Sequence, residues 1–397
     1  MKKIIILLAA VTGFTANAQW SLTGNAGTTP GTNFLGTTDN QPLVFKINND
    51  EKMKLSPNGR LVFFNANSQT WAYNLYIGGG NEVPSNNPGG VNYANVAVGL
   101  GSMSSNTTGY ANTALGYNTL TNSTTGTLNT ALGINSMQFA VTANNNVAVG
   151  GNSLGGIVSG EFNTAIGYQA LRAWGSVSSV PLIGNTALGT AALLRLTNGN
   201  NNTVLGYNGF LNTLTANNNI SVGYNNAPNA NNASGNIYIG NNILPYASQP
   251  TNELNIGNWI VGNNGTIGIG EFTNQLPADG YAADGGKYKL FVKDGIKTEK
   301  VKVDIAANNG WADYVFEKDY KLMSLNNVEK FINENGHLPE VPTTEEAIKN
   351  GIELKEMNIL LLKKVEELTL HLIQQNKELS VQKEEIEILK KQMNLSK

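Results

Sequence analysis

The sequence predicts a mostly β protein: a parallel β-roll, or β-solenoid, of eleven repeats of about 17 residues, followed by a small α+β neck and a C-terminal parallel, trimeric coiled coil. Three observations predict it. A glycine recurs at regular intervals through the middle of the chain, large and small residues alternate before each glycine, and residues 354–397 carry an apolar heptad pattern.

Composition narrows the classes of function. Only 14% of the 397 residues are charged, against about 25% in an ordinary soluble domain. Net charge is −2, which gives no basic field for nucleic acid, and the absence of cysteine excludes disulfides and thiolate metal sites. We therefore expect a non-catalytic protein without metal or cofactor, because residues 61–270 contain only five charged side chains: Glu82, Glu161, Arg172, Arg195 and Glu253.

Residues 1–18 have the three parts of a secretory signal peptide. Lys2 and Lys3 precede the apolar run Ile4–Ala10, and Ala16 and Ala18 supply small residues at the cleavage site. The run is far shorter than the ~20 residues of a membrane span, and no other segment approaches that length. We expect cleavage after Ala18 and a secreted protein, extracellular or on the outer cell surface, with no membrane span in the mature chain.

Residues 19–70 are predicted to form an N-terminal β cap. Leu43–Asp50 and Leu61–Phe64 are expected to be short strands, because Asn, Asp, Pro and Gly separate these apolar runs. An open solenoid needs its first coil covered, which this module would do.

Residues 71–270 are the repeat region. The spacing between successive glycines is 17 residues except for one interval of 21 and one of 22, which predicts a solenoid. The glycines are Gly78, Gly99, Gly116, Gly133, Gly150, Gly167, Gly189, Gly206, Gly223, Gly240 and Gly257.

The residues around each glycine repeat as well. An aliphatic residue stands directly before the glycine, and a mostly β-branched or aliphatic residue stands two positions before that aliphatic residue. A small residue lies between the two. This alternation predicts a short strand with one face of large side chains and one of small ones. Coils about 4.8 Å apart should bury aliphatic ladders. Asn opens ten of the eleven units and should stack as an amide ladder. A second apolar column follows four residues after the glycine: Met103, Leu120, Met137, Leu154, Leu171, Leu193, Phe210, Ala227 and Leu244.

Units such as Asn112–Leu120 resemble the head repeats of trimeric autotransporter adhesins. The resemblance implies a left-handed parallel β-roll with three chains side by side. The repeat is longer here than is usual in those heads, and the C-terminus lacks the membrane-spanning strands that anchor those adhesins.

Four further segments resemble secreted phage-tail-fibre-like proteins: Phe34–Leu43, Trp311–Phe316, Gly336–Pro339 and Glu366–Leu370. In its position the C-terminal part is similar to the intramolecular chaperone of phage tail spikes. The serine-based self-cleavage motif of that chaperone is not recognisable, so we expect no autoproteolysis.

Residues 271–310 are predicted to be a β-hairpin linker, with Asp294-Gly295 as the turn between the arms of residues 288–303. Residues 311–353 are the α+β neck. Ser324 should cap a helix over Leu325–Asn335 that ends at Gly336, and Thr344 should cap another short helix. His337 has no partner for metal binding or catalysis, which favours a packed or hydrogen-bonded loop residue.

Residues 354–397 are predicted to be the coiled coil. Glu378 with Lys383 and Glu385 with Lys390 fall at g and the following e, as parallel pairing requires, and Gln375 and Gln382 are polar layers. The alternative is an amphipathic helix packed on its own domain. The residues expected to hold the copies together are Leu361, Val365, Leu368, Leu372, Leu379, Ile386 and Leu389.

The 22-residue interval supplies a candidate contact loop. It carries Arg172, Trp174 and Pro181 in a five-residue insertion, and insertions in solenoids map to loops on one face. The alternative is a tolerated bulge at a corner.

These features predict an exported, homotrimeric fibrous surface protein, adhesin-like or receptor-binding, with a glycan or cell-surface ligand. A structural component of a secreted matrix or appendage is the alternative. A polysaccharide-degrading solenoid is disfavoured, because it needs clustered carboxylates. Calcium-binding repeats need an aspartate in every turn, and residues 61–270 contain none.

Overall fold

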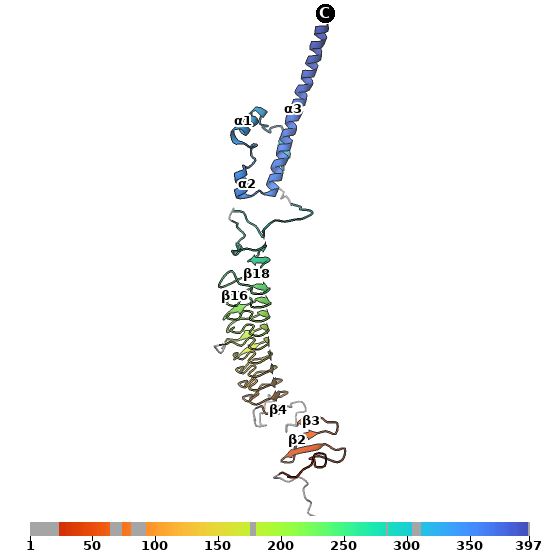
Figure 1. The fold of residues 1–397 in the computed structure, drawn as a ribbon, viewed down its shortest axis with the longest axis vertical. Helices are drawn as coiled ribbons and strands as arrows, with labels where there is room; N and C mark the ends of the chain where they lie inside the picture. Colours follow the sequence, from red (N-terminus) through yellow and green to blue (C-terminus); the bar gives the residue numbers. More distant parts are fainter. Residues whose placement is uncertain are drawn as a thin grey trace, which may run out of the picture. The chain divides into compact units, whose positions relative to one another are not determined.

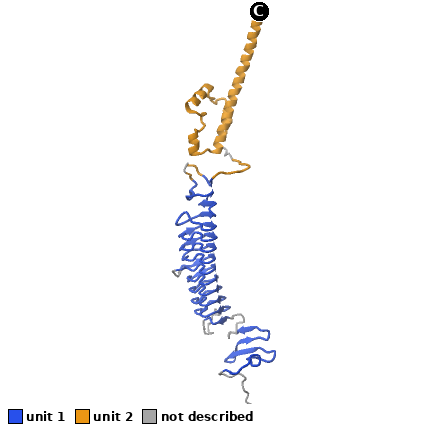
Figure 2. Cartoon of the chain, in the orientation of Figure 1, with its two compact units in different colours: residues 1–280, 288–293 blue, residues 281–287, 294–397 orange. Residues whose placement is uncertain are grey.

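The computed structural model describes residues 24–63, 74–80, 93–174, 180–282, 285–303 and 311–395, so the predicted signal peptide lies outside the described residues. The chain divides into two compact units (Figure 2). The first comprises residues 1–280 and 288–293, and the second residues 281–287 and 294–397.

The N-terminal strands form a sheet of their own. β1 (Leu43–Ile47), β2 (Asp50–Leu55) and β3 (Leu61–Phe63) pair as an antiparallel meander. The sequence predicted one strand over residues 43–50, but Asn48 and Asn49 adopt left-handed φ values of 55° and 66° and end β1 in a turn. That this sheet caps the solenoid stays a prediction.

The repeats fold as a parallel β-solenoid of about ten turns (Figure 1). One strand per repeat stacks in register, so that Thr113, Ala114 and Leu115 lie opposite the same residue types at 130–132. The parallel strands are β4 (Leu75–Ile77), β5 (Val96–Val98), β6 (Thr113–Leu115), β7 (Thr130–Leu132), β8 (Val147–Val149), β10 (Thr164–Ile166), β12 (Thr186–Leu188), β13 (Thr203–Leu205), β15 (Ile220–Val222), β17 (Ile237–Ile239) and β18 (Glu253–Ile256).

Two short parallel pairs form a second line of contacts between neighbouring coils. β9 (Gly160–Glu161) pairs with β11 (Leu182–Ile183), and β14 (Ala216–Asn217) pairs with β16 (Ala233–Ser234). The 22-residue repeat therefore keeps its register on both sides of the insertion, since β10 still pairs with β12.

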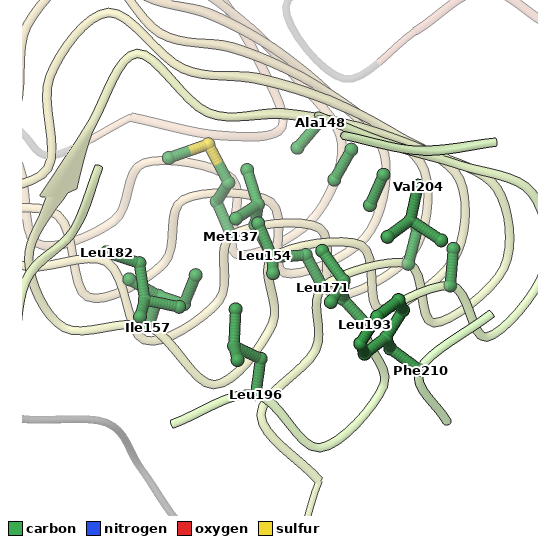
Figure 3. Packing of buried hydrophobic residues seen from close by; sticks show 14 of the residues in the cluster. Met137, Ala148, Leu154, Ile157, Leu171, Leu182, Leu193, Leu196, Val204 and Phe210 are labelled. Carbon is green, nitrogen blue, oxygen red and sulfur yellow. The ribbon is translucent and has the colours of Figure 1, made fainter. Parts of the chain in front are cut away.

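The core is a ladder of large side chains facing a ladder of small ones. In Figure 3, Met137, Leu154, Leu171 and Leu193 follow one another inside the coils, and Ala148 lies across from them. The column four residues after each glycine is buried as predicted, except at its end, where Leu244 is exposed. Ile243 takes the place of Leu244 in the core, and its N–H donates to Asn226 Oδ1 at 3.0 Å.

The sequence-based expectation that both aliphatic columns are buried is wrong for the strand. Alternation along a strand lets either alanine or its two large neighbours face inward. The interior already holds the Leu/Met column, so alanine points inside and the large residues point out. Ala114 is 0% exposed, whereas the adjacent Leu115 is 46% exposed.

The predicted amide ladder is confirmed. The Asn129 N–H and Nδ2 both donate to Asn112 Oδ1 at 3.0 Å, and Nδ2 also donates to the Ala143 carbonyl at 2.7 Å. Asn129 Oδ1 in turn accepts from the N–H and Nδ2 of Asn146, both at 3.1 Å. Each buried amide thus satisfies corner groups on its own coil and links the coils on either side.

Glu253 ends the ladder at the position where the other repeats have Asn. It is 2% exposed, its N–H donates to Asn236 Oδ1 at 2.9 Å, and its carboxylate accepts from the Tyr238 hydroxyl at 2.9 Å. The Tyr246 N–H and Gln275 Nε2 also donate to this carboxylate, at 3.3 and 3.2 Å. The Glu253 carboxylate therefore holds the segments around Tyr246 and Gln275 against the last coil.

Beyond β18 the sheet turns antiparallel. β19 (Ile260–Asn263) pairs with β18, β20 (Thr266–Ile269) pairs with β19, and β21 (Leu290–Val292) then runs parallel to β20. The predicted hairpin of residues 288–303 is not formed. Asp294 and Gly295 do have the positive φ values of its turn, but its first arm pairs with β20, and 293–303 contain no strand.

The second unit contains η1 (Ala312–Phe316), α1 (Leu325–Asn335), α2 (Thr344–Asn350) and the single long helix α3 (Leu354–Leu395). α1 begins after Ser324 and ends at left-handed Gly336, as predicted. The cap of α2 is Thr343 instead of Thr344. Thr343 forms a capping box with Glu346, which shifts the helix start by one residue.

We predict that Asn129→Ala lowers the free energy of unfolding by roughly 3 kcal/mol, because it leaves buried groups of Ala143 and Asn146 without partners. Urea unfolding followed by circular dichroism at fixed protein concentration measures the change. Asn122→Ala on the preceding coil is the control, since the half-buried Asn122 side chain makes no hydrogen bond to any described residue. Equal losses for both variants would contradict a role specific to the ladder.

Candidate functional site

The outward residues of the strands form a continuous apolar surface on the solenoid. We call the first and third residues of the ten three-residue parallel strands β4, β5, β6, β7, β8, β10, β12, β13, β15 and β17 the sheet face. Its members are Leu, Ile, Val and Thr, none of them charged. The most exposed are Ile77, Leu115, Leu132, Val147, Ile166, Leu188, Ile220, Ile237 and Ile239.

The sheet face matches in size the largest apolar patch of an ordinary soluble monomer, a kind of patch that is often functional. Ten strands at ~4.8 Å and the width of the two columns give an area on the order of 400 Å². Patches of a few hundred Å² are the largest that soluble monomers usually expose, and they mark interaction sites. The sequence showed these residues clearly but could not show which face of the strand pointed outward.

A column of half-exposed aromatic and aliphatic residues follows the glycines and borders the sheet face. Tyr207 and Tyr224 stack with ring centroids 5.5 Å apart and planes 8° from parallel. Rings stacked along the coil axis present their edges to solvent and cover each other's faces. This pair therefore extends the apolar border, and its two inner ring faces are covered.

A second uncovered apolar surface lies on α3. We call the predicted oligomerisation residues, Leu361, Val365, Leu368, Leu372, Leu379, Ile386 and Leu389, the helix seam. Each is exposed, by 49–59%, and every residue from 372 to 395 is exposed. Coiled-coil pairing of this single helix stays a prediction.

The neck packs on a different side of α3. Glu366, one residue after Val365, is 8% exposed, and Lys363 and Glu367 are half-buried on the same side. The alternative of a helix packed on its own domain therefore holds only for the first half of α3, and that packing leaves the helix seam uncovered.

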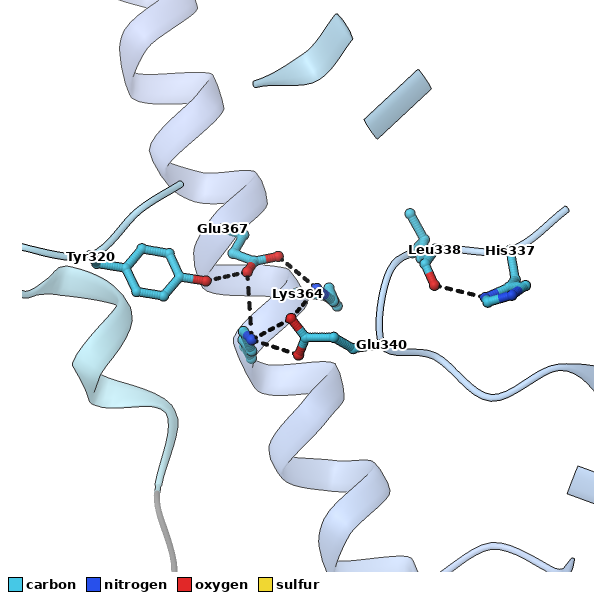
Figure 4. Close-up of polar contacts among 7 residues, drawn as sticks. Tyr320, His337, Leu338, Glu340, Lys364 and Glu367 are labelled. Atoms are coloured by element: carbon cyan, nitrogen blue, oxygen red, sulfur yellow. Dashed lines mark hydrogen bonds and ion pairs between the residues drawn. The ribbon is translucent and has the colours of Figure 1, made fainter. Parts of the chain in front are cut away.

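Polar contacts fix the neck to α3 (Figure 4). Glu367 accepts hydrogen bonds from the Tyr320 hydroxyl and, at 2.9 Å, from Lys364 Nζ, while Lys363 Nζ donates to both carboxylate oxygens of Glu340 at 2.6 and 2.7 Å. Burial raises the pKa of Glu367, but Tyr320 and the two lysines outweigh it and hold the pKa below its usual value. The pKa of Tyr320 is raised by burial and by the Glu367 carboxylate.

His337 is a packed loop residue, as favoured from sequence. Its Nδ1 lies 2.9 Å from the Leu338 carbonyl oxygen (Figure 4). Its ring also meets the Phe331 ring edge-on, with centroids 5.5 Å apart. Within the described ranges, no three His, Asp or Glu side chains are grouped so that they could hold a metal ion.

The insertion brings two of its three predicted contact residues together. The Arg172 guanidinium carbon lies 4.2 Å from the centroid of the Trp174 ring, and Trp174 is 47% exposed. Pro181 is exposed, on the other side of residues 175–179, which lie outside the described part. The Trp174 N–H donates to the Leu194 carbonyl at 2.9 Å and so places exposed Arg195 on the adjoining coil.

Arg195 was not among the predicted contact residues. Adding the 22-residue interval to Arg172 leads to Leu194, the residue before Arg195. The repeat alignment therefore contained the signal.

Comparison with known proteins identifies no relative: no family model, curated protein or solved structure matches the chain. No helix in the described ranges has both the length and the apolar composition needed to cross a bilayer.

We predict that Glu367→Gln reduces the acid sensitivity of the neck. A carboxyl whose folded pKa is lowered contributes stability above its unfolded pKa of about 4.3 and loses that contribution as the pH falls through the folded pKa. Thermal melts of the helical signal between pH 7 and 3 should show a smaller decrease for Glu367→Gln than for the wild type. Glu356→Gln, an exposed carboxyl on α3, should melt like the wild type, and a wild-type acid response in both variants would refute the assignment.

Proposed function

We propose that the chain is an exported, non-catalytic fibrous surface protein that works as a homotrimer and presents its solenoid to a glycan or a cell-surface ligand. The observation that carries the proposal is that one chain leaves two separate apolar surfaces uncovered, the sheet face and the helix seam.

A further copy of the chain is the occupant that fits the sheet face best. The face repeats at the spacing of the strands, and another sheet face has the same period. It also carries no charge, so like surfaces meet without repulsion. Three copies that each bury a sheet face of about 400 Å² would bury on the order of 1,200 Å² in all, at the lower end of stable association, and the seam adds to this area.

The helix seam supports the same arrangement. From Leu361 to Leu389 the seam extends for ~42 Å at 1.5 Å per residue, long enough for several heptads. A parallel coil of these helices would hold the chains in register, which helps non-local parallel strands to form, because their pairing is slow. Three copies are proposed because the resemblance to trimeric heads and the two surfaces agree on parallel chains.

Chemistry at the solenoid favours contact over catalysis. The described solenoid carries two carboxylates, Glu161 and Glu253, and Glu253 is buried and hydrogen-bonded in the ladder. A degrading solenoid needs carboxylates paired across a bound sugar. The predicted signal peptide supports export. The alternative is a structural component of a secreted matrix. Such a protein would have the same export signal, solenoid and oligomer, but no ligand.

Light scattering after size exclusion tests the proposal on residues 19–397 and on a chain ending at Glu353. We predict a threefold mass for the longer chain and a smaller or aggregated species for the shorter one. Monomers of both would refute the oligomeric fibre.

Charged substitutions test the sheet face separately. We predict that Leu132→Glu with Leu188→Glu shifts the protein toward smaller species, because each interface would then bury unpaired carboxylates. Leu128→Glu is the matched control, since Leu128 is 51% exposed but lies on a corner outside the sheet face. An unchanged mass in the double variant would remove the sheet face from the interface.

A further inference from the structure

We propose that Arg172, Trp174 and Arg195 form a binding site for an acidic polysaccharide, one whose sugars carry carboxylate or sulfate groups. The inference rests on the proposed contact function and gives it a ligand class. The three residues lie on two adjoining coils, beside the only insertion that lengthens a repeat from 17 to 22 residues.

The backbone at the insertion is bent to place Trp174. Ala173 has a φ of 55°, in the left-handed region that costs residues other than glycine energy. The residues at this position in neighbouring coils, Phe139, Gly156 and Arg195, do not have positive φ. Among these four coils a positive φ at this position occurs only at Ala173, and such backbone clusters at ligand-binding sites. The bond from the Trp174 N–H to the Leu194 carbonyl then holds the tryptophan on the next coil.

The stacking of Arg172 on Trp174 prepares the arginine for an anion. A guanidinium lying over an aromatic ring at 4.2 Å uses its flat face for the stacking. The N–H groups in its plane stay free to donate a pair of hydrogen bonds to a carboxylate or sulfate. A side chain already held in one conformation loses less freedom when the ligand binds.

The charge at this place is not balanced by the protein. Arg172 and Arg195 are the two cations of residues 61–270, and neither has an ion pair with a carboxylate in the described ranges. Glu161 lies on another side of the coil, in β9, where Asn144 Nδ2 donates to it at 3.4 Å, and Glu253 is buried at the solenoid's end. Arg172 and Arg195 therefore leave two positive charges on adjoining coils that an anion would neutralise.

A sugar chain is the anion that suits the rest of the surface. Half-exposed Trp174 supplies an apolar contact for the C–H groups of a sugar ring, and the coils around it are rich in uncharged Asn, Thr and Ser. Nucleic acid needs many cations along its path, and this solenoid has two.

The test measures binding of residues 19–397 to polygalacturonate, dextran sulfate and neutral dextran by isothermal titration calorimetry. We expect binding to at least one acidic polymer, weakening as salt rises, and none to dextran. Preference for polygalacturonate assigns the ligand group as carboxylate, and preference for dextran sulfate assigns it as sulfate.

Variants locate the binding. Arg172→Gln and Arg195→Gln should each weaken it about tenfold, as expected for loss of a charge-assisted hydrogen-bonded contact. Arg172→Lys should weaken it as well, because an ammonium lacks the planar pair of donors. Trp174→Ala should do the same, whereas Trp259→Ala, which alters a 78% exposed tryptophan elsewhere in the unit, should bind like the wild type.

Failure of both acidic polymers to bind, equal binding of neutral dextran, or binding that survives both Arg→Gln changes would overturn the site. The mass in solution separates this failure from failure of the proposed function. A threefold mass without polysaccharide binding would retain the fibre and remove only its acidic ligand.

Discussion

Every coil of the solenoid depends on a buried asparagine that bonds to the asparagine of the next coil. Corners of a solenoid leave backbone N–H and C=O groups that cannot join a strand ladder, and a buried unpaired group costs about 1–3 kcal/mol. Asn129 satisfies such groups on its own coil and the next through one amide. Because each amide bonds to the equivalent atoms above and below, the ladder fixes the register of the coils, including across the 22-residue interval, where the Asn185 N–H donates to Asn163 Oδ1 at 3.0 Å.

The close stacking of the coils decides which side chains of each strand are exposed. Coils held this closely have room for one column of large side chains opposite alanine, so the large residues of each strand are left in solvent. Close stacking also explains the glycines. A Cβ on Gly133 would lie 2.8 Å from the Gly150 carbonyl, closer than side chains approach backbone. The sheet face is thus a consequence of the ladder, and its exposure is what leads us to propose further copies of the chain.

The sequence was sufficient for the features that depend on repetition or on local chemistry. The glycine spacing predicted the solenoid, the recurring Asn predicted the ladder, and Ser324 with Gly336 predicted both ends of α1. The direction of the strand faces was not predictable, because a period of two is the same whichever face is buried. The hairpin prediction over 288–303 failed because a local turn signal at Asp294-Gly295 does not say that β20 competes for the first arm.

Two further features could not be predicted from the sequence, because they also depend on distant parts of the chain. The core residues after each glycine, such as Leu120 with φ 51°, adopt a left-handed conformation that apolar residues rarely take. Burial of a leucine contributes about 1.5–3 kcal/mol and outweighs a strain of roughly 1–2 kcal/mol, but only when the coil is stacked. The pairing of Arg172 with Trp174 likewise depends on the left-handed Ala173.

Site-directed crosslinking tests most directly whether copies of the chain cover the sheet face. The chain contains no cysteine, so one introduced cysteine is the only thiol. Leu188→Cys, in the middle of the sheet face, and Leu128→Cys, outside it, would be treated with a short bis-maleimide and separated on a denaturing gel. Our account predicts crosslinked chains for Leu188→Cys and single chains for Leu128→Cys. Single chains for both, or equal crosslinking of both, would contradict it.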